Sequence, residues 1–247
     1  MGVEKQGVTD DTVASGRSAM IELDNICYRY PAEGPEAGAL ALGDISLTLE
    51  RGESVALMGP NGCGKSTLLR LFNGLIFADS GTYRFDGQVV DRKAMHDQLF
   101  AKRLHQRLGF VFQNPDVQLF CPSVAEEVAF GPRQMGLSVA EVEERAQSCL
   151  ELMGIGHLAE RAPYHLSGGE KHKVALACVI SMSPDVLVLD EPLSGLDEES
   201  SAWLLGFLIR LRDAGTTLLI STHHTALADE VAHRTIRMDK DHRIVEC

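Results

Sequence analysis

Short, continuously apolar segments recur along the chain and alternate with segments of helical periodicity. They are SVALM at 54–58, RLGFVF at 107–112, DVLVLD at 185–190 and TTLLIS at 216–221. Strands that are apolar on both faces are typical of a parallel sheet covered by helices on each side. The pattern therefore predicts an α/β core built on a parallel sheet.

The N-terminal part has a different pattern. Strand-like runs at 20–30 and 45–50 flank PAEGPEAGA at 31–39, which is rich in turn-forming residues. This arrangement favours an antiparallel β part. A further strand pair is expected around TIRM and RIVE near the end of the sequence. Residues 1–19 lack any hydrophobic period, so we expect a disordered tail there and a folded domain over 20–247.

Residues from 114 to about 165 carry the signals of separate helices, and we predict a helical subdomain inserted into the core. Ser123 with Glu126 and Ser138 with Glu141 have the spacing of a capping box. An apolar stripe then repeats at helical spacing, and we interpret it as facing the core. The stripe consists of Val142, Ala146, Cys149, Leu150 and Met153.

Composition narrows the class of protein. The 247 residues are 45% hydrophobic and carry a formal net charge of −12. Surfaces that bind nucleic acid are built from clustered positive charge, so we do not expect a large nucleic-acid-binding surface here. No apolar stretch is long enough to span a bilayer and no secretory signal is present, so we expect a cytoplasmic chain that reaches a membrane at most through a partner. The six cysteines form no C-x-x-C pair, and we expect reduced thiols that are mostly buried.

A phosphate-binding sequence follows the run SVALM. GPNGCGKST at 59–67, the phosphate loop, fits G-x-x-x-x-G-K-[ST] and opens into a segment of helical period. Backbone N–H groups from about Gly62 to Thr67 would converge on phosphate oxygens. Lys65 would contact the β- and γ-phosphates, and Ser66 would ligate Mg²⁺. Cys63 is interpreted as a small filler, with a redox switch as the alternative. The other expected nucleotide-binding positions of the loop are Gly59, Asn61 and Gly64.

In DVLVLDEP at 185–192 an apolar strand ends in two adjacent carboxylates, Asp190 and Glu191. A strand that ends beside the phosphate loop can direct both at the metal and the terminal phosphate. Asp190 would hold Mg²⁺ through water, and Glu191 would orient and polarise the attacking water as a general base. The alternative is a strand end with two solvated acids.

The signature segment, LSGGEKHK at 166–173, contains a third capping-box pair, Ser167 and Glu170. Gly168 and Gly169 leave the helix N-terminus unobstructed. Its amides and the Ser167 hydroxyl could therefore bind a phosphate brought by another molecule.

Together these segments resemble the ATP-binding-cassette ATPases. The order GPNGCGKST, Gln113 after a strand, LSGGE, VLVLDEP, SGLD at 194–197 and STHH at 221–224 follows the motif order of that family over nearly all of 20–247. The resemblance implies a P-loop NTPase fold, with a RecA-like parallel core, an antiparallel β subdomain and an inserted α-helical subdomain. It also implies that two such domains close head to tail, with each ATP between the phosphate loop of one and LSGGE of the other.

The same resemblance assigns further roles. Tyr30 would stack on adenine, Gln113 would sense Mg²⁺ and the attacking water, and Asp197 would couple the two sites. His223 would be the switch histidine, a residue type that can donate a hydrogen bond to the γ-phosphate in either common protonation state. The sequence departs from the usual Gln, Arg and acid at Glu170, His172 and His224, and we infer no altered mechanism from them.

Within that family, FQNPDVQLF at 112–120 and SVAEEVAFGP at 123–132 resemble the energy-coupling-factor importers of vitamins and of cobalt or nickel ions. In such systems the ATPase docks beneath a transmembrane component through the segment after Gln113. Asp116, Gln118 and Phe120 are therefore candidate docking residues, and Phe120 is equally a candidate for the core.

The resemblance thus implies an ATPase that uses ATP and Mg²⁺ to drive import at the cytoplasmic face of the cell membrane. Its expected partners are a second such ATPase, either identical or a similar paralogue, and integral-membrane subunits, without nucleic acid. The alternatives are the ATPase of another importer or of an exporter, a soluble clamp acting on nucleic acid or the ribosome, and a nucleotide-binding regulator without hydrolysis.

Overall fold

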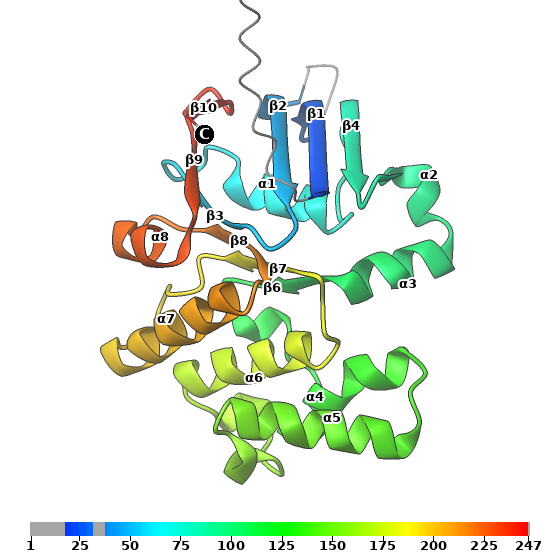
Figure 1. Ribbon diagram of the computed structural model, residues 1–247, viewed down its shortest axis with the longest axis vertical. Coiled ribbons are helices and arrows are strands. Elements are labelled where there is room, and N and C mark those ends of the chain that lie inside the picture. Colours follow the sequence, from blue (N-terminus) through cyan, green and yellow to red (C-terminus); the bar gives the residue numbers. More distant parts are fainter. Residues whose placement is uncertain (1–17, 32–37, 247) are drawn as a thin grey trace, which may run out of the picture.

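The computed structural model describes residues 18–31 and 38–246, and its larger sheet has six strands in the order β10-β9-β3-β8-β7-β6 (Figure 1). The strands are β3 Ser54–Met58, β6 Leu108–Val111, β7 Val186–Asp190, β8 Thr217–Ser221, β9 Arg234–Met238 and β10 Ile244–Glu246. All neighbours pair in parallel except β10 with β9. Every residue of β3, β6, β7 and β8 is buried, which explains their unbroken apolar runs. The predicted parallel core is confirmed.

A smaller antiparallel sheet has the order β2-β1-β4-β5 in the described part of the chain. Its strands are β1 Ala19–Arg29, β2 Leu40–Glu50, β4 Ser80–Phe85 and β5 Gln88–Val89. β2 starts before the predicted run at 45 because pairing with β1 continues across an irregularity near Asp44, whose φ is 58°. Strand β1 starts at Ala19, and residues 1–17 of the predicted tail lie outside the described residues.

Helix α1 lies between the two sheets. Its residues Leu68, Leu69 and Phe72 are buried in one hydrophobic core with side chains of β1, β2 and β3. Helix α1 spans Lys65–Phe72. The other helices that accompany the two sheets are α2 Arg92–Met95, α3 Gln98–Arg107, α7 Glu198–Asp213 and α8 Thr225–Val231. Helix α1 is therefore packed against strands of both sheets.

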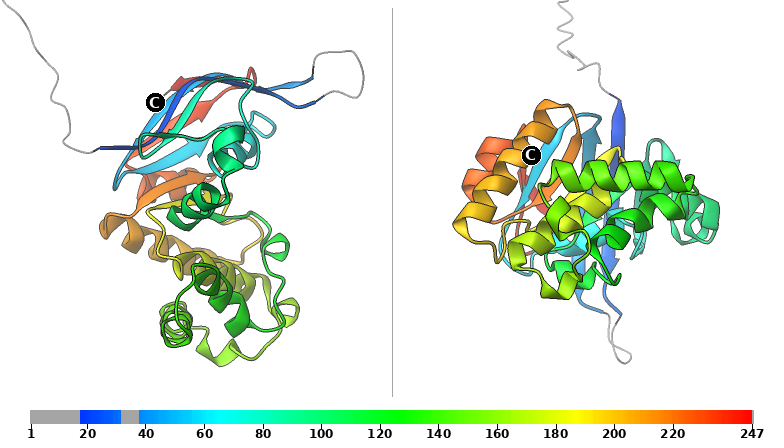
Figure 2. Two further views of the ribbon diagram at one scale, coloured as in Figure 1. Left: turned by 90° about the vertical axis from the view of Figure 1, so that its right-hand side faces the viewer. Right: turned by 90° about the horizontal axis from the view of Figure 1, so that it is seen from below.

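A layer of helices occupies the end of the molecule away from the antiparallel sheet (Figure 2). It contains α4 Val124–Gln134, α5 Val139–Leu152 and α6 Gly168–Ile180, with 3-10 turns at Pro115–Val117, Gly156–Leu158 and Pro163–His165. The stripe predicted to face the core is buried, as expected. The Ser138 and Glu141 capping box is complete, whereas Ser123 accepts from the Glu126 N–H without a return bond among the described residues. None of the described helices is long and apolar enough to cross a bilayer.

A contact between a lysine of α6 and a tryptophan of α7 joins this layer to the helices that cover the core sheet. Trp203 and Phe207 of α7 stack with ring centroids 5.4 Å apart and planes 5° from parallel. The Nζ of Lys173, on α6, lies 4.6 Å from the centre of the Trp203 ring. A cation over an indole face is attracted by the ring quadrupole, so this contact holds α6 against α7.

An ionic network connects the two sheets. The Arg107 guanidinium, at the end of α3, donates to Asp185 at 2.5 Å and to Asp86 at 2.8 Å. Arg51 lies 3.4 Å from the same Asp86 carboxylate. The hydrogen bond from Arg107 holds the pKa of Asp86 below its usual value.

The cysteines agree only partly with the prediction. Cys63 and Cys149 are buried, whereas Cys27, Cys121 and Cys178 are half-buried. No disulfide joins the described cysteines, and Cys247 lies outside the described residues.

Candidate functional site

The phosphate loop runs from the end of β3 to the start of α1 and is packed tightly on both sides. Gly59 and Gly64 have φ values of 153° and 108°, which side chains rarely allow. A Cβ at Gly59 would lie 2.5 Å from the Met238 carbonyl oxygen of β9, and one at Gly64 would overlap the Ala41 carbonyl oxygen of β2. The loop can follow this path because glycine stands at both positions.

Lys65 is held inside the loop that precedes it. Its Nζ donates to the carbonyl oxygen of Gly59 at 2.9 Å and contacts that of Pro60 at 3.4 Å. The same Nζ lies 3.8 Å from Glu191 Oε1, and the Lys65 side chain is 7% exposed. A buried ammonium is thus placed between the loop and the end of β7.

The two carboxylates at the end of β7 diverge: Asp190 is the last residue of the strand and Glu191 follows it. Asp190 stays beside β8, where its Oδ1 accepts a hydrogen bond from the Ser221 hydroxyl. Glu191 turns away with a left-handed φ of 45°, and its N–H donates to Ser221 at 3.0 Å. The alternative of two solvated acids is wrong, because Asp190 is 9% and Glu191 8% exposed.

Glu191 contacts the histidine that follows β8. Its Oε2 lies 2.8 Å from His223 Nδ1 and 3.3 Å from the His223 backbone N–H. Because a carboxylate accepts, Nδ1 carries the hydrogen that points at Glu191. From this rotamer, Nε2 can donate to a phosphate only when the ring is an imidazolium. We expected either protonation state of His223 to donate to a phosphate, whereas in this rotamer the imidazolium alone can do so.

A polar cavity of about 730 Å³ brings most of the predicted residues together. Tyr30, just after β1, reaches it with its hydroxyl 3.1 Å from Thr67 Oγ1. Gln113, just after β6, donates from Nε2 to Ser194 Oγ at 3.2 Å. The predicted residues in the cavity wall are Tyr30, Asn61, Gly62, Gly64, Lys65, Ser66, Thr67, Gln113, Glu191 and His223.

Three predicted residues lie behind the wall. Gly59 contributes the carbonyl that holds Lys65, and Cys63 is 2% exposed. Asp190 is kept at the sheet by Ser221.

The cavity also has walls that the sequence analysis missed. Ala39, Leu40 and Ala41 contribute from β2 and the residue before it, and His242 contributes from the turn between β9 and β10. The His242 Nδ1 lies 3.1 Å from the Cys63 carbonyl oxygen, across 179 positions of sequence. No motif marks such a contact, because it depends on how the last strands fold back.

The signature segment does not reach this cavity within one chain. Ser167 and Glu170 form a complete capping box at the start of α6, and the Ser167 backbone N–H lowers the pKa of Glu170. Gly169 packs closely against Ser200 of α7. Ser167, Gly168 and Gly169 therefore lie beside the start of α7 and outside the cavity wall.

Asp197 caps the helix that meets the signature segment. It accepts from the Ser200 N–H at 2.7 Å, which lowers the pKa of Asp197. Two other signature residues have structural contacts: the buried His172 donates from Nδ1 to the Gly168 carbonyl at 2.9 Å, and Lys171 pairs with Asp116 at 2.6 Å.

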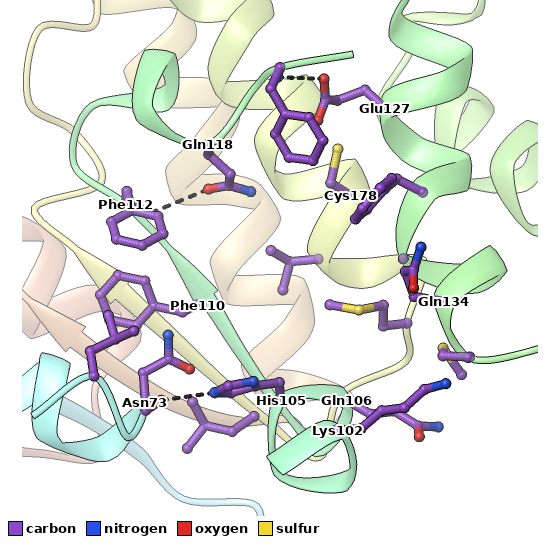
Figure 3. A pocket seen from close by; sticks show the side chains of 18 residues that line it. Asn73, Lys102, His105, Gln106, Phe110, Phe112, Gln118, Glu127, Gln134 and Cys178 are labelled. Atoms are coloured by element: carbon purple, nitrogen blue, oxygen red, sulfur yellow. Dashed lines mark hydrogen bonds between the residues drawn. The ribbon is translucent and has the colours of Figure 1, made fainter. Parts of the chain in front are cut away.

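A second hollow, the apolar groove, has a volume of about 460 Å³ and lies between β6, α3 and the helical layer (Figure 3). Its apolar wall includes Leu108, Phe110, Phe112, Phe120, Phe130 and Val179. Phe120 is 67% exposed and meets Phe130 edge to face at 5.0 Å. Gln118 donates to the Ala175 carbonyl oxygen at 3.0 Å and so fixes the segment that leads to Phe120.

Comparison with known proteins gives consistent matches. The ABC transporter family model matches residues 42–194. The nickel import ATP-binding protein LarO of Lactiplantibacillus plantarum is 48% identical over 91% of each chain. The energy-coupling factor transporter ATP-binding protein EcfA of Methanothermobacter thermautotrophicus is 44% identical over 92% of this chain and 70% of its own.

Solved structures agree with these relatives. CbiO1 of Clostridium perfringens, part of the ABC transporter complex cbiONQ, has a TM-score of 0.80 and 34% identity, covering 92% of this chain and 87% of its own. The ATP-binding cassette MJ0796, in a dimeric post-hydrolysis state bound to ADP and Pi, has a TM-score of 0.81 and 28% identity over 92% of this chain and 97% of its own. The predicted P-loop NTPase fold is confirmed, and the chain belongs to the ATP-binding-cassette ATPases of ABC transporters.

Proposed function

We propose that this chain hydrolyses ATP in the polar cavity and so drives import through membrane subunits of an energy-coupling-factor-type transporter. The observation that carries the catalytic part is the position of Glu191. Its buried carboxylate lies 2.8 Å from His223 Nδ1 and 3.8 Å from Lys65 Nζ, beside the phosphate loop. This position of Glu191 fits a general base placed where the terminal phosphate and the attacking water would meet.

In the proposed reaction each residue has one task. Lys65 and the loop amides bind the β- and γ-phosphates, as a helix N-terminus with free N–H groups favours. Glu191 accepts a proton from the water whose oxygen attacks the γ-phosphorus, while the bond to the bridging oxygen breaks and ADP leaves. His223 donates to the γ-phosphate, and Gln113 orients the water. Tyr30 stacks on adenine.

The residues around the loop also fit Mg²⁺. The candidate donors are the Ser66 hydroxyl and the Gln113 amide oxygen, with the Asp190 carboxylate acting through water, and Mg²⁺ prefers oxygen ligands. Gln113 uses its Nε2 on Ser194, which leaves its amide oxygen free to turn toward a metal. Mg²⁺, when bound, would neutralise charge on the phosphates.

A second ATPase would complete the site. Ser167, Gly168, Gly169 and Asp197 lie outside the cavity wall of their own chain, although their helix ends offer donors to a phosphate. The dimeric state of MJ0796 supports a pair of such chains. In the proposed pair the two chains lie head to tail, and each provides this segment to its partner. The partner is a second copy of this chain or a similar paralogue.

The apolar groove is the proposed docking site for a membrane subunit at the cytoplasmic face. Phe120 and Gln118 line it, whereas Asp116 is paired with Lys171. Large exposed aromatic side chains beside a groove favour the insertion of an apolar helix. The cargo would be a nickel or cobalt ion or a vitamin, in keeping with the nickel importer and the energy-coupling-factor relatives. The net charge of −12 argues against a clamp on nucleic acid.

The test is co-purification from gently solubilised membranes of the native host, followed by mass spectrometry. We expect wild type and Val139→Asp to recover small integral-membrane proteins, because Val139 is 75% exposed on the helical layer and does not line the groove. Phe120→Asp should lose them. Recovery with ribosomes or nucleic acid alone, or equal recovery by the two variants, would contradict the docking proposal.

A further inference from the structure

The turn between β9 and β10 contacts the phosphate loop through the side chain of His242. The φ of His242 is 63°, in the left-handed region that side-chain-bearing residues seldom adopt. Its carbonyl oxygen accepts from the Gly43 N–H at 2.9 Å, which fixes the turn to β2. Strained backbone held by its surroundings is found preferentially at functional sites.

The imidazole of His242 is hydrogen-bonded to one peptide group of the phosphate loop, the one between Cys63 and Gly64. Its Nδ1 lies 3.1 Å from the Cys63 carbonyl oxygen, and because that oxygen can only accept, Nδ1 is the donor. In a trans peptide the C=O and the following N–H point in opposite directions. Holding the Cys63 C=O toward the turn therefore directs the Gly64 N–H away from it. Among the described residues, the Gly64 N–H has no protein acceptor.

The same hairpin fits closely against the loop at another point and opens onto the cavity. Gly59 has no room for a Cβ because of the Met238 carbonyl of β9, and Met238 Cε lies near Gly64. His242 is half-buried and belongs to the wall of the polar cavity, together with Tyr30 and Lys65. The contact with Cys63 is therefore part of the cavity's own structure.

We propose that His242 is a nucleotide-positioning residue, whose Nδ1–H holds the Cys63 carbonyl and thereby presents the Gly64 N–H to the phosphates. This inference rests on the proposed function of the polar cavity as the ATP site. Without the bond, the peptide can rotate and a phosphate donor is lost. Nucleotide affinity then falls, while Glu191 and His223 keep their places.

The test compares His242→Gly with His242→Asn in the full-length chain. Both residues tolerate the left-handed backbone, and the Asn Nδ2 can replace the His Nδ1 as donor. Kd values for ATP and ADP with Mg²⁺ are measured by titration calorimetry, and KM and kcat by phosphate release. We expect His242→Gly to raise Kd and KM about threefold to tenfold, the range for one lost hydrogen bond, with kcat changed less than about twofold. His242→Asn should restore most of the affinity.

Arg243→Gly is the matched control, because glycine gives the same turn more backbone freedom, keeps the backbone N–H that donates to Asp239, and leaves the donor to Cys63 in place. Unchanged affinity in His242→Gly, an equal loss in His242→Asn, or an equal loss in Arg243→Gly would overturn the proposal. If His242→Gly does not fold, His242→Asp, which has the size of Asn and no donor when ionised, takes its place with the same expectation. Lys65→Ala separates the two proposals: wild-type ATP binding by that variant would refute the ATP site itself.

Discussion

Replacing Glu191 by glutamine removes the proposed base and keeps its size. The structure places the Glu191 carboxylate 2.8 Å from His223 Nδ1, and an amide oxygen at the same position can still accept that hydrogen bond. The amide cannot take a proton from water. A positioned general base contributes at least about 100-fold, which corresponds to about 2.7 kcal/mol in the activation free energy.

The same substitution should not weaken ATP binding. Glu191 Oε1 lies 3.8 Å from Lys65 Nζ, a separation at which opposite charges attract by about 4 kcal/mol at the effective dielectric of a protein, before desolvation is counted. Loss of the negative charge frees the Lys65 ammonium for phosphate. We therefore expect Kd for ATP to stay the same or decrease, so the whole effect appears in kcat.

The assay is single-turnover and steady-state phosphate release by the assembled transporter, with Kd for ATP from titration calorimetry. Glu230→Gln, which neutralises an exposed acid on α8 away from the cavity, serves as the matched control. Hydrolysis by Glu191→Gln within tenfold of wild type would refute the base assignment. A large loss of ATP affinity would instead refute the charge argument for Lys65.

Three further changes test the fold and the loop. Asp86→Asn should lower the free energy of unfolding at pH 7 by about 0.5 kcal/mol, since the pair with Arg107 is partly exposed. Because the pKa of Asp86 is lowered in the folded state, this difference between the variants should vanish as urea melts are repeated at falling pH. A difference that stays constant with pH would contradict this assignment. Ser138→Ala should cost about 1 kcal/mol in the same melts, and no change would mean that the capping box does not stabilise α5. Gly64→Ala should lose ATP binding in calorimetry, because its Cβ meets the Ala41 carbonyl; wild-type affinity would show that the loop can relax.

The core strands could be predicted because their signal is local. A strand buried on both faces favours apolar residues, and the interiors of β3, β7 and β8 are apolar, with polar residues at strand ends alone. Asp190 and Glu191 could be predicted for the same reason, because Asp190 ends β7 and Glu191 follows it directly. What the sequence could not show is their divergence, because it depends on Ser221 of the neighbouring strand and on the left-handed backbone of Glu191.

The β2 wall and His242 were missed for a physical reason. Leu40 and Ala41 precede an irregularity at Asp44 that hides the pairing with β1 from a simple alternation test. His242 joins the cavity because β9 pairs with β3 and β10 folds back onto β9, and a lone histidine in a turn carries no periodicity. Residues whose contacts are far away in the sequence leave no pattern in a short sequence window.

The contact of Lys173 with Trp203 has a spectroscopic consequence. Trp203 is the one tryptophan in the sequence, so excitation at the red edge of protein absorbance yields emission from a single site. That site lies at the junction of α6, which carries the signature segment, and α7, which packs on the core. Any rotation of the helical layer that moves the Lys173 ammonium off the indole changes the local field and hence the emission maximum. Emission from Trp203 would therefore report a displacement of α6 relative to α7 without an added dye.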